Sequence, residues 1–405
     1  MKRSFYYYQV RLVIAYSYFL LHILLVFPSA GTCQEYIAGK TYFGHRDFTS
    51  YQAGNLPFIL AAAHGGDLRP NDLPARNCNE CSYTRDAYTI ELTMEIATAI
   101  YNKTGCYPHV VINHLHRIKL DANRDIQEAA LGNPEAERAW SDFHKFIDAS
   151  KSQINENSGK GLFLDIHGHG HSIQRIELGY LLYDDELRLS DQVLNTAEFV
   201  GYSSIRNLAI DNKQQLKHSE LLRGNSSLGQ YFSFKGFPSV PSVDIPFPLA
   251  SHPYFSGGYN TARHGSWKGG TIDGIQIECN QQLRFNDIER KKFAADFAEV
   301  ILQYVEAHYF DDFSGIQCLS SVQNMNGWYN SSIHAIPNPL LTETRLLIKD
   351  DNNLLQIKIT DITGKVVSVF TSTGDIINLE HLIPGFYILE ANTGKGVYSA
   401  KILKL

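Results

Sequence analysis

The sequence predicts an α/β domain, with helices on the faces of a central sheet, followed by a small all-β sandwich. Up to about residue 310, short apolar runs alternate with longer amphipathic segments, as strands and helices do in such a sheet. Beyond residue 336, short alternating runs are separated by turn sequences such as Thr363-Gly364-Lys365, which favours a sandwich. Several apolar runs of the first part end in histidine or a carboxylate, which places polar side chains at strand ends.

Composition limits the class of protein. The chain has 405 residues, 44% of them hydrophobic, which is typical of a globular protein of one or two domains. The net charge of -6 gives no basic surface for nucleic acid, so no nucleic-acid partner is expected. Six cysteines are too few for a disulfide scaffold. Cys78 and Cys81 lack a second such pair, which favours a local disulfide over a zinc site.

Residues 1–33 have the pattern of a signal peptide. Lys2 and Arg3 precede an uncharged apolar run, 12–27, and small residues follow it. A retained anchor is the alternative, although the run is short for a membrane span. No later segment is apolar enough to cross a membrane, so we expect an exported protein that is soluble or attached to the cell surface.

Four regions are expected in all, and hydrophobic periodicity locates their elements. They are the signal peptide 1–33, a catalytic domain 34–315, a linker 316–335 and the sandwich 336–405. In the catalytic domain, buried strands are expected over 57–63, 109–115, 162–166 and 272–279. A helix is expected to begin with Thr84 or Asp86 as its N-cap and to end at Gly105. Further helices are expected over 125–153, broken at 132–134, and over 286–308.

For the middle of the chain, 172–270, the sequence predicts less regular structure than for the segments on either side. The run 176–182 is a candidate strand, and the other short runs suggest strands joined by long loops. Four prolines argue against regular structure in the second half of this segment: Pro238, Pro241, Pro246 and Pro248.

Polar residues at strand ends and a helix start suggest a metal site. His64 and His167 each follow an apolar run, and Asp86 stands where a helix is expected to begin. Two histidines and one carboxylate form the ligand set of a catalytic zinc with an open position for water. Glu278, at the end of another strand, would be the general base for that water, whose pKa zinc lowers to about 7. Each residue also has a plainer interpretation as a loop, cap or surface residue.

Arginines after the second strand are candidates for holding an anionic substrate. Arg124 and Arg117 could each bind a carboxylate through a two-bond fork. The alternative for Arg124 is a solvated ion pair with Asp121 or Asp125.

Six short motifs resemble those of the N-formylglutamate amidohydrolase family, in the same order and spacing. The similarity covers roughly residues 55–310. The motifs are His64-Gly65-Gly66, the run 117–124 with Asp121, Asn123 and Arg124, Asp165-Ile166-His167-Gly168, Gly257-Gly258-Tyr259, Arg263-His264-Gly265 and Gln276-Ile277-Glu278.

This resemblance implies a fold like that of zinc carboxypeptidases, with a mixed sheet between helices and Zn²⁺ at its carboxyl edge. It implies that His64 and His167 are zinc ligands and that Glu278 is the general base. Asn123 and Arg124 match a pair that holds a substrate carboxylate. The reaction implied is hydrolysis of an amide next to an acidic amino acid.

The third ligand has two candidates. Carboxypeptidases place it three residues after the first histidine, where this chain has Asp67, whereas the amidohydrolases place it at the next helix start, where it has Asp86. We favour Asp86, because the amidohydrolase pattern matches elsewhere. Asp165 is expected to orient a ligand from behind, as carboxylates near metal-bound histidines do.

The end of the chain resembles the C-terminal sorting domain of the type nine secretion system of Bacteroidetes. The matching segments are Pro337-Asn338-Pro339, 359–365, 382–387 and 401–405. This resemblance implies contact with the secretion machinery and export through the periplasm to the cell surface or beyond.

We therefore expect a secreted, zinc-dependent hydrolase that acts on a small acylated amino acid or a peptide. Its export makes peptides, γ-glutamyl polymers and cell-wall fragments plausible substrates beside formylglutamate. The alternatives are a carboxypeptidase or γ-glutamyl hydrolase, a zinc deacylase or esterase, and a non-catalytic binding protein on the same fold.

Overall fold

The computed structural model describes residues 34–78, 81–310, 333–336, 342–348, 354–361, 364–371, 376–393 and 396–404. The chain divides into two compact units, Met1–Ser321 and Val322–Leu405. The predicted signal peptide and most of the predicted linker lie outside the described residues, so the exact limits of those regions stay predictions. Among the described residues, no helix combines the length and the apolar character needed to cross a membrane.

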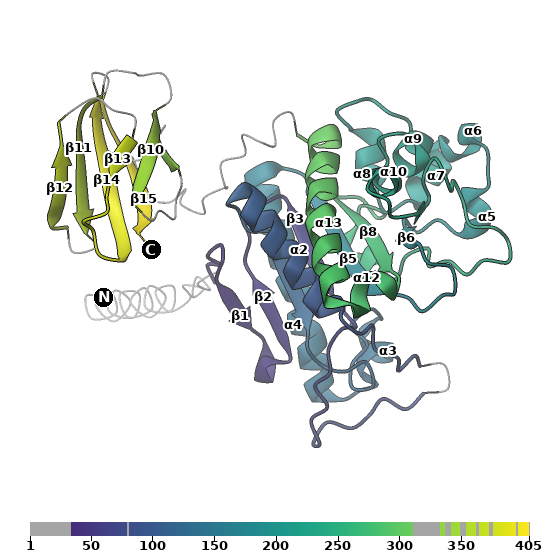
Figure 1. The fold of residues 1–405 in the computed structure, drawn as a ribbon. Coiled ribbons are helices and arrows are strands. Elements are labelled where there is room, and N and C mark those ends of the chain that lie inside the picture. The colour runs from purple at the N-terminus through teal and green to yellow at the C-terminus, as the bar shows by residue number, and fades with distance from the viewer. Residues whose placement is uncertain are drawn as a thin grey trace, which may run out of the picture. The chain divides into compact units, whose positions relative to one another are not determined.

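The first unit is built on a mixed sheet (Figure 1), and this part of the prediction is confirmed. Within the described residues the strand order is β1-β2-β4-β3-β5-β8-β6-β7. Strands β4, β3, β5 and β8 are parallel, whereas β2 and β6 run antiparallel to their neighbours β4 and β8. The bounds are β1 Thr41–Phe43, β2 Thr49–Gln52, β3 Phe58–Ala62, β4 His109–Asn113, β5 Gly161–Gly168, β6 Ile176–Gly179, β7 Ser239–Val240 and β8 Ile272–Cys279.

Helices cover both faces of this sheet. Helices α2 (Thr89–Thr104) and α13 (Asp287–His308) pack against each other on one face, and α4 (Pro134–Ser158) lies on the other (Figure 1). The parallel strands are rich in apolar residues because both of their faces are buried. Thus Leu60 belongs to the core under α2 and α13, whereas its neighbour Ile59 belongs to the core under α4.

The helix before the second parallel strand begins later than predicted. Helix α2 starts at Thr89 with Tyr88 as its N-cap, and neither Thr84 nor Asp86 caps it. The side chain of Asp86 is directed at two histidines instead, and so is not available to the helix N-H groups. The end at Gly105, in the left-handed conformation, is as predicted. The predicted break at 132–134 is also present, between α3 (Ile126–Ala130) and α4.

The middle of the chain is more helical than predicted. Beside β6 and β7, the described residues of this segment form seven short helices: α5 Asp184–Leu187, α6 Asp191–Leu194, α7 Ala197–Tyr202, α8 Arg206–Ile210, α9 His218–Arg223, α10 Leu228–Phe234 and α11 Tyr259–His264. Such short helices show little sequence periodicity and are marginal alone. They are stabilised by buried side chains such as Leu187, Leu208 and Phe232, which join the core under α2 and α13. Another short helix, α12 Gln282–Phe285, follows β8.

The second unit contains two antiparallel sheets, in agreement with the predicted sandwich. One has the order β13-β10-β9 and the other β12-β11-β14-β15 in the described residues. Ile377 of the first sheet shares a core with Ile357, Leu389 and Ile402 of the second. The bounds are β9 Ile333–Ile336, β10 Glu343–Ile348, β11 Leu354–Asp361, β12 Val366–Phe370, β13 Ile376–Asn378, β14 Gly385–Thr393 and β15 Gly396–Lys404. The predicted disulfide between Cys78 and Cys81, in the first unit, is present.

Candidate metal site

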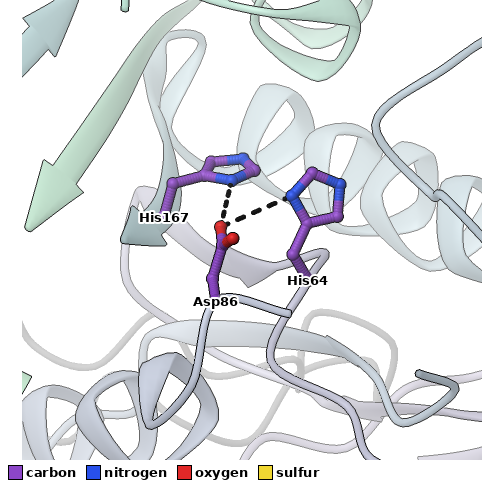
Figure 2. A group of neighbouring side chains, drawn as sticks. All are labelled: His64, Asp86 and His167. Atoms are coloured by element: carbon purple, nitrogen blue, oxygen red, sulfur yellow. Dashed lines mark hydrogen bonds and ion pairs between the residues drawn. The ribbon is translucent and has the colours of Figure 1, made fainter. Parts of the chain in front are cut away.

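Three polar side chains converge at the carboxyl edge of the parallel strands. His64 lies two residues after β3, His167 lies near the end of β5, and Asp86 lies in the loop before α2. Figure 2 shows their side chains pointing toward one another, and one ligand atom from each lies within 4.8 Å of the other two. All three residues are buried. The structure therefore brings together the two histidines and the carboxylate that the sequence indicated as a ligand set.

The atoms that face one another are two imidazole nitrogens and one carboxylate oxygen. Oδ2 of Asp86 lies 3.0 Å from Nδ1 of His167 and 3.4 Å from Nδ1 of His64. Nδ1 of His64 is buried, and its 3.4 Å contact with Asp86 does not have the geometry of a hydrogen bond. A poorly satisfied buried nitrogen is unfavourable, and a cation bound between these atoms would satisfy it. The donor set therefore fits a divalent metal ion.

A second carboxylate lies behind each histidine. Nε2 of His167 lies 2.9 Å from Oδ2 of Asp165, and Nε2 of His64 lies 2.6 Å from Oδ1 of Asp121. Such contacts fix the ring orientation and direct Nδ1 toward the metal position. The sequence predicted this role for Asp165, whereas it indicated Asp121 only as part of a motif. Because metal-binding histidines generally have a carboxylate partner, the role of Asp121 beside His64 could have been predicted as well.

Two glycines let the loop after His64 pack closely against the start of α2 and the segment after β4. A Cβ atom on Gly65 would lie 2.6 Å from side-chain atoms of Thr89 and Ile90. One on Gly66 would lie 2.3 Å from the carbonyl group of His114. Side chains at these two positions would force the loop away, so the motif His64-Gly65-Gly66 serves close backbone packing.

Carboxylates and imidazoles alternate through the site. Burial raises the pKa of Asp86, but hydrogen bonds from His167 and His64 outweigh it and hold that pKa well below its usual range. Burial disfavours the charged form of His167, yet the carboxylates of Asp165 and Asp86 raise its pKa well above its usual value. Burial by itself would raise the pKa of Asp121. The contacts with His64 and the nearby arginines outweigh this effect and hold that pKa well below its usual value. The contacts between carboxylates and imidazoles thus shift the pKa values of Asp86, His167 and Asp121.

Glu278 lies beside this group because of strand register. On β8 it is the direct partner of His167 on β5, and Glu177 of β6 is its partner on the other side. Nε2 of Gln276 donates a hydrogen bond of 3.0 Å to Oε1 of Glu278. Burial raises the pKa of Glu278 to about 8; the charge of His167 opposes this rise and that of Asp86 adds to it. A glutamate that exchanges a proton near neutral pH suits a general base.

The two candidate arginines have different surroundings. Arg117 is mostly buried, its Nε donates to Oδ2 of Asp121 at 2.9 Å, and its Nη1 lies 4.0 Å from Oδ1 of Asp86. Arg124 is more exposed, and its Nε donates to Glu128 at 3.0 Å. Arg124 thus pairs with Glu128 and not with Asp121 or Asp125, the partners that the solvated alternative named for it. Their roles toward a substrate stay predictions.

Asn123 is buried beside His167. Its Nδ2 lies 3.4 Å from Nε2 of His167, and its Oδ1 accepts a hydrogen bond of 2.7 Å from the backbone N-H of Asn260. Nδ2 of Asn260 is in turn 3.5 Å from Oδ1 of Asp165. Asn260, on α11, was not singled out from the sequence; only its place after Gly257-Gly258-Tyr259 could have drawn attention to it.

Asp67, the alternative ligand, lies away from the two histidines. Its carboxylate forms ion pairs with Arg69 at 3.2 Å and with Arg85 at 3.0 Å, and about 61% of its side chain is exposed. It does not belong to the group formed by His64, Asp86 and His167. The geometry favours Asp86.

The other two histidines of the 162–171 stretch form a separate group with Glu177. Nε2 of His169 donates to the backbone oxygen of Arg175 at 2.8 Å, and its Nδ1 accepts from the N-H of His171. Nδ1 of His171 lies 3.1 Å from Oε1 of Glu177, which Arg175 also approaches at 3.4 Å. Because both nitrogens of His169 are bonded and a guanidinium lies close, this group is a polar network rather than a cation site.

Comparisons with known proteins differ for the two units. Residues 334–404 match the model of a secretion system C-terminal sorting domain, which confirms the prediction for the second unit. No curated protein matches the chain.

Solved structures match about two thirds of the chain at low identity. N-formylglutamate amidohydrolase from Ralstonia eutropha JMP134 is 12% identical over 64% of this chain and 97% of its own, with a TM-score of 0.40. A gene product of Agrobacterium tumefaciens is 14% identical over 64% of this chain and 93% of its own, with a TM-score of 0.40. Succinylglutamate desuccinylase from Chromobacterium violaceum is 12% identical over 66% of this chain and 70% of its own, with a TM-score of 0.29.

The high pKa of Glu278 predicts how the metal-free protein responds to pH. An unfolded glutamate has a pKa of about 4.3, so the folded state binds this proton more tightly than the unfolded state does. The stabilising contribution is complete below that value and is lost as the pH rises through about 8. In the presence of a chelator, the free energy of unfolding should therefore fall less between about pH 6 and 9 in Glu278→Gln than in the wild type.

Urea unfolding at several pH values measures this difference. The exposed Glu289, on α13, offers a matched control, and Glu289→Gln should keep the wild-type pH profile. If Glu278→Gln shows the same fall as the wild type, the buried proton is not on Glu278.

Proposed function

We propose that the first unit is a zinc-dependent hydrolase that cleaves an amide bond next to a carboxylate-bearing amino acid. The observation that carries the proposal is the convergence of two Nδ1 atoms and one carboxylate oxygen, each histidine being backed by its own carboxylate. That donor set, with an open position, is the one found in catalytic zinc sites. The motif resemblance to N-formylglutamate amidohydrolases supports the same reaction.

His64, Asp86 and His167 would hold the ion, which supplies polarisation of the scissile carbonyl and a lower pKa for the attacking water. Asp121 and Asp165 would keep each histidine oriented with its Nδ1 toward the ion. An imidazole must be neutral to donate its lone pair, so His167 has to release its proton when a metal binds.

Glu278 would move the proton of the reaction. Its carboxylate would accept a proton from the attacking water and pass it to the leaving nitrogen, so that water and amide give an acid and an amine. Its raised pKa would fall beside a divalent cation, leaving the carboxylate ready to accept the proton at neutral pH. Gln276, which donates to Oε1, would orient it.

Removing the carboxylate ligand tests the metal site. We expect Asp86→Ala to bind zinc at least about 100-fold more weakly than the wild type, because a ligand to the ion is lost. The control Asp67→Ala should bind zinc normally, since its carboxylate pairs with surface arginines. Elemental analysis and chelator competition measure binding, and release assays on formylglutamate, C-terminal peptides and γ-glutamyl oligomers measure activity.

A folded wild-type protein that cannot be loaded with zinc would contradict the mechanism. Loss of zinc in Asp67→Ala alone would transfer the ligand role to Asp67. Zinc binding without hydrolysis of any acylated amino acid, peptide or ester would favour the non-catalytic alternative.

Arg124 is the better placed of the two arginines for a substrate carboxylate. Arg117 forms an ion pair with Asp121, and Asp121 in turn contacts His64. Nη1 of Arg124 donates to the backbone oxygen of Asn123, and its ion pair in the described part of the chain is with the exposed Glu128. A surface pair of this kind contributes about 0–1 kcal/mol. A substrate carboxylate could therefore displace Glu128.

For formylglutamate, Arg124→Ala should raise KM roughly tenfold to hundredfold with little change in kcat, because a charge-assisted contact of about 1.5–3 kcal/mol is lost. Glu128→Ala, which frees the guanidinium, should lower KM or leave it unchanged. Steady-state kinetics distinguish these results, and an unchanged KM in Arg124→Ala would remove Arg124 from the substrate site.

We also propose that the second unit directs export through a type nine secretion system. The match of residues 334–404 to a secretion sorting domain supports this. In a host with that system, deletion of 334–405 should leave the protein in the periplasm with its hydrolase activity intact, because the first unit has its own core. Cell fractionation and immunoblotting measure the location, and normal export of the shortened chain would contradict the assignment.

A further inference from the structure

A buried arginine outside the metal site connects the segments that build it. Arg284 lies on α12, just after β8, and is 2% exposed. Its Nε donates to the backbone oxygen of Cys279 at 3.0 Å, and its Nη2 donates to that of His169 at 3.1 Å. Its Nη1 donates to the backbone oxygen of Ala87. One guanidinium thus bonds three main-chain carbonyls from three separate segments.

Each of those carbonyls lies next to a residue of the proposed site. Ala87 follows Asp86 directly, Cys279 follows Glu278 directly, and His169 is two residues beyond His167. The three segments come from a loop and two strands, and strand pairing fixes only β5 against β8. The bond to Ala87 therefore adds a direct tie between the Asp86 loop and the two strand ends.

The glycine after His167 makes room for this guanidinium. A Cβ atom on Gly168 would lie 2.2 Å from Cζ and 2.4 Å from Nε of Arg284. Such distances are far inside van der Waals contact, so any side chain at position 168 would displace the arginine. Gly168, the first glycine in the alternation of glycine and histidine at the end of β5, is thus needed for the packing of Arg284.

Arg284 is itself held by α13. Nη1 of Arg290 donates to the backbone oxygen of Arg284 at 3.0 Å, and Arg290 forms a two-bond pair with Glu95 of α2, each bond 3.0 Å long. A planar guanidinium with five N-H donors can satisfy three carbonyls at once, which a lysine ammonium cannot do with the same geometry.

We propose that Arg284 is a positioning residue that sets the spacing of Asp86, His167 and Glu278 through their adjoining carbonyls. The inference rests on the proposed metal-dependent function of that site. Removal of the guanidinium would leave three buried carbonyls without their donor and free the Asp86 loop to move relative to the strand ends. Loss of Arg284 should therefore weaken metal binding and alter the geometry around the metal, as well as lower the stability of the fold.

The test uses the full chain with three substitutions. Arg284→Met removes the guanidinium, and Gly168→Ala displaces it while retaining it. Arg223→Met is the matched control, since Arg223 also donates to two backbone oxygens, those of Leu187 and Leu189, among the short helices of the middle segment. Zinc affinity by chelator competition, the absorption spectrum of the cobalt(II)-loaded protein and the melting temperature are measured for each.

The first two variants should bind zinc about tenfold more weakly or worse, with an altered cobalt spectrum. Arg223→Met should melt earlier but keep the wild-type affinity and spectrum. If Arg284→Met and Gly168→Ala lower only the melting temperature, Arg284 is a structural residue and the inference is wrong. Failure of the wild type itself to bind zinc would instead overturn the proposed function, so the two failures are distinguishable.

Discussion

The side chain of Asp165 lies inside the sheet with no exposure to solvent, and its charge is tolerable there because His167 lies 2.9 Å away. Burying an unpaired charge is very unfavourable, and this constraint governs the whole site. His167 in turn faces Asp86, which faces His64, which faces Asp121. Carboxylates and imidazoles alternate along this series, so loss of any one member leaves a neighbour buried without its partner.

The parallel strands bring the members of this series together. Since β3, β5 and β8 run the same way, their carboxyl ends meet at one edge of the sheet, where ligands commonly bind. Asp86 comes from a loop and needs other ties. Its backbone N-H donates to the backbone oxygen of His64 at 3.0 Å, and the N-H of Gly168 donates to its Oδ2 at 3.3 Å. The loop is thereby joined to both histidine segments.

Local sequence was sufficient to predict those elements that are long or are apolar on both faces. The strands around 58–62 and 272–279 and the helix near 287–308 agree closely with prediction. The prediction was wrong for the seven short helices described in the middle segment. Helices of four to seven residues have too few turns to show periodicity, and they exist because leucines and aromatic rings dock on an existing core.

The sequence by itself determined the residue types that can bind a cation and the strand ends that carry them, because strand periodicity and glycine turns are local properties. It also identified the secretion sorting domain. Only the tertiary structure decided that Asp86 rather than Asp67 faces the histidines, and that Asp121 backs His64. Those contacts join positions separated by tens of residues, and they depend on strand order and loop packing, which no local pattern specifies.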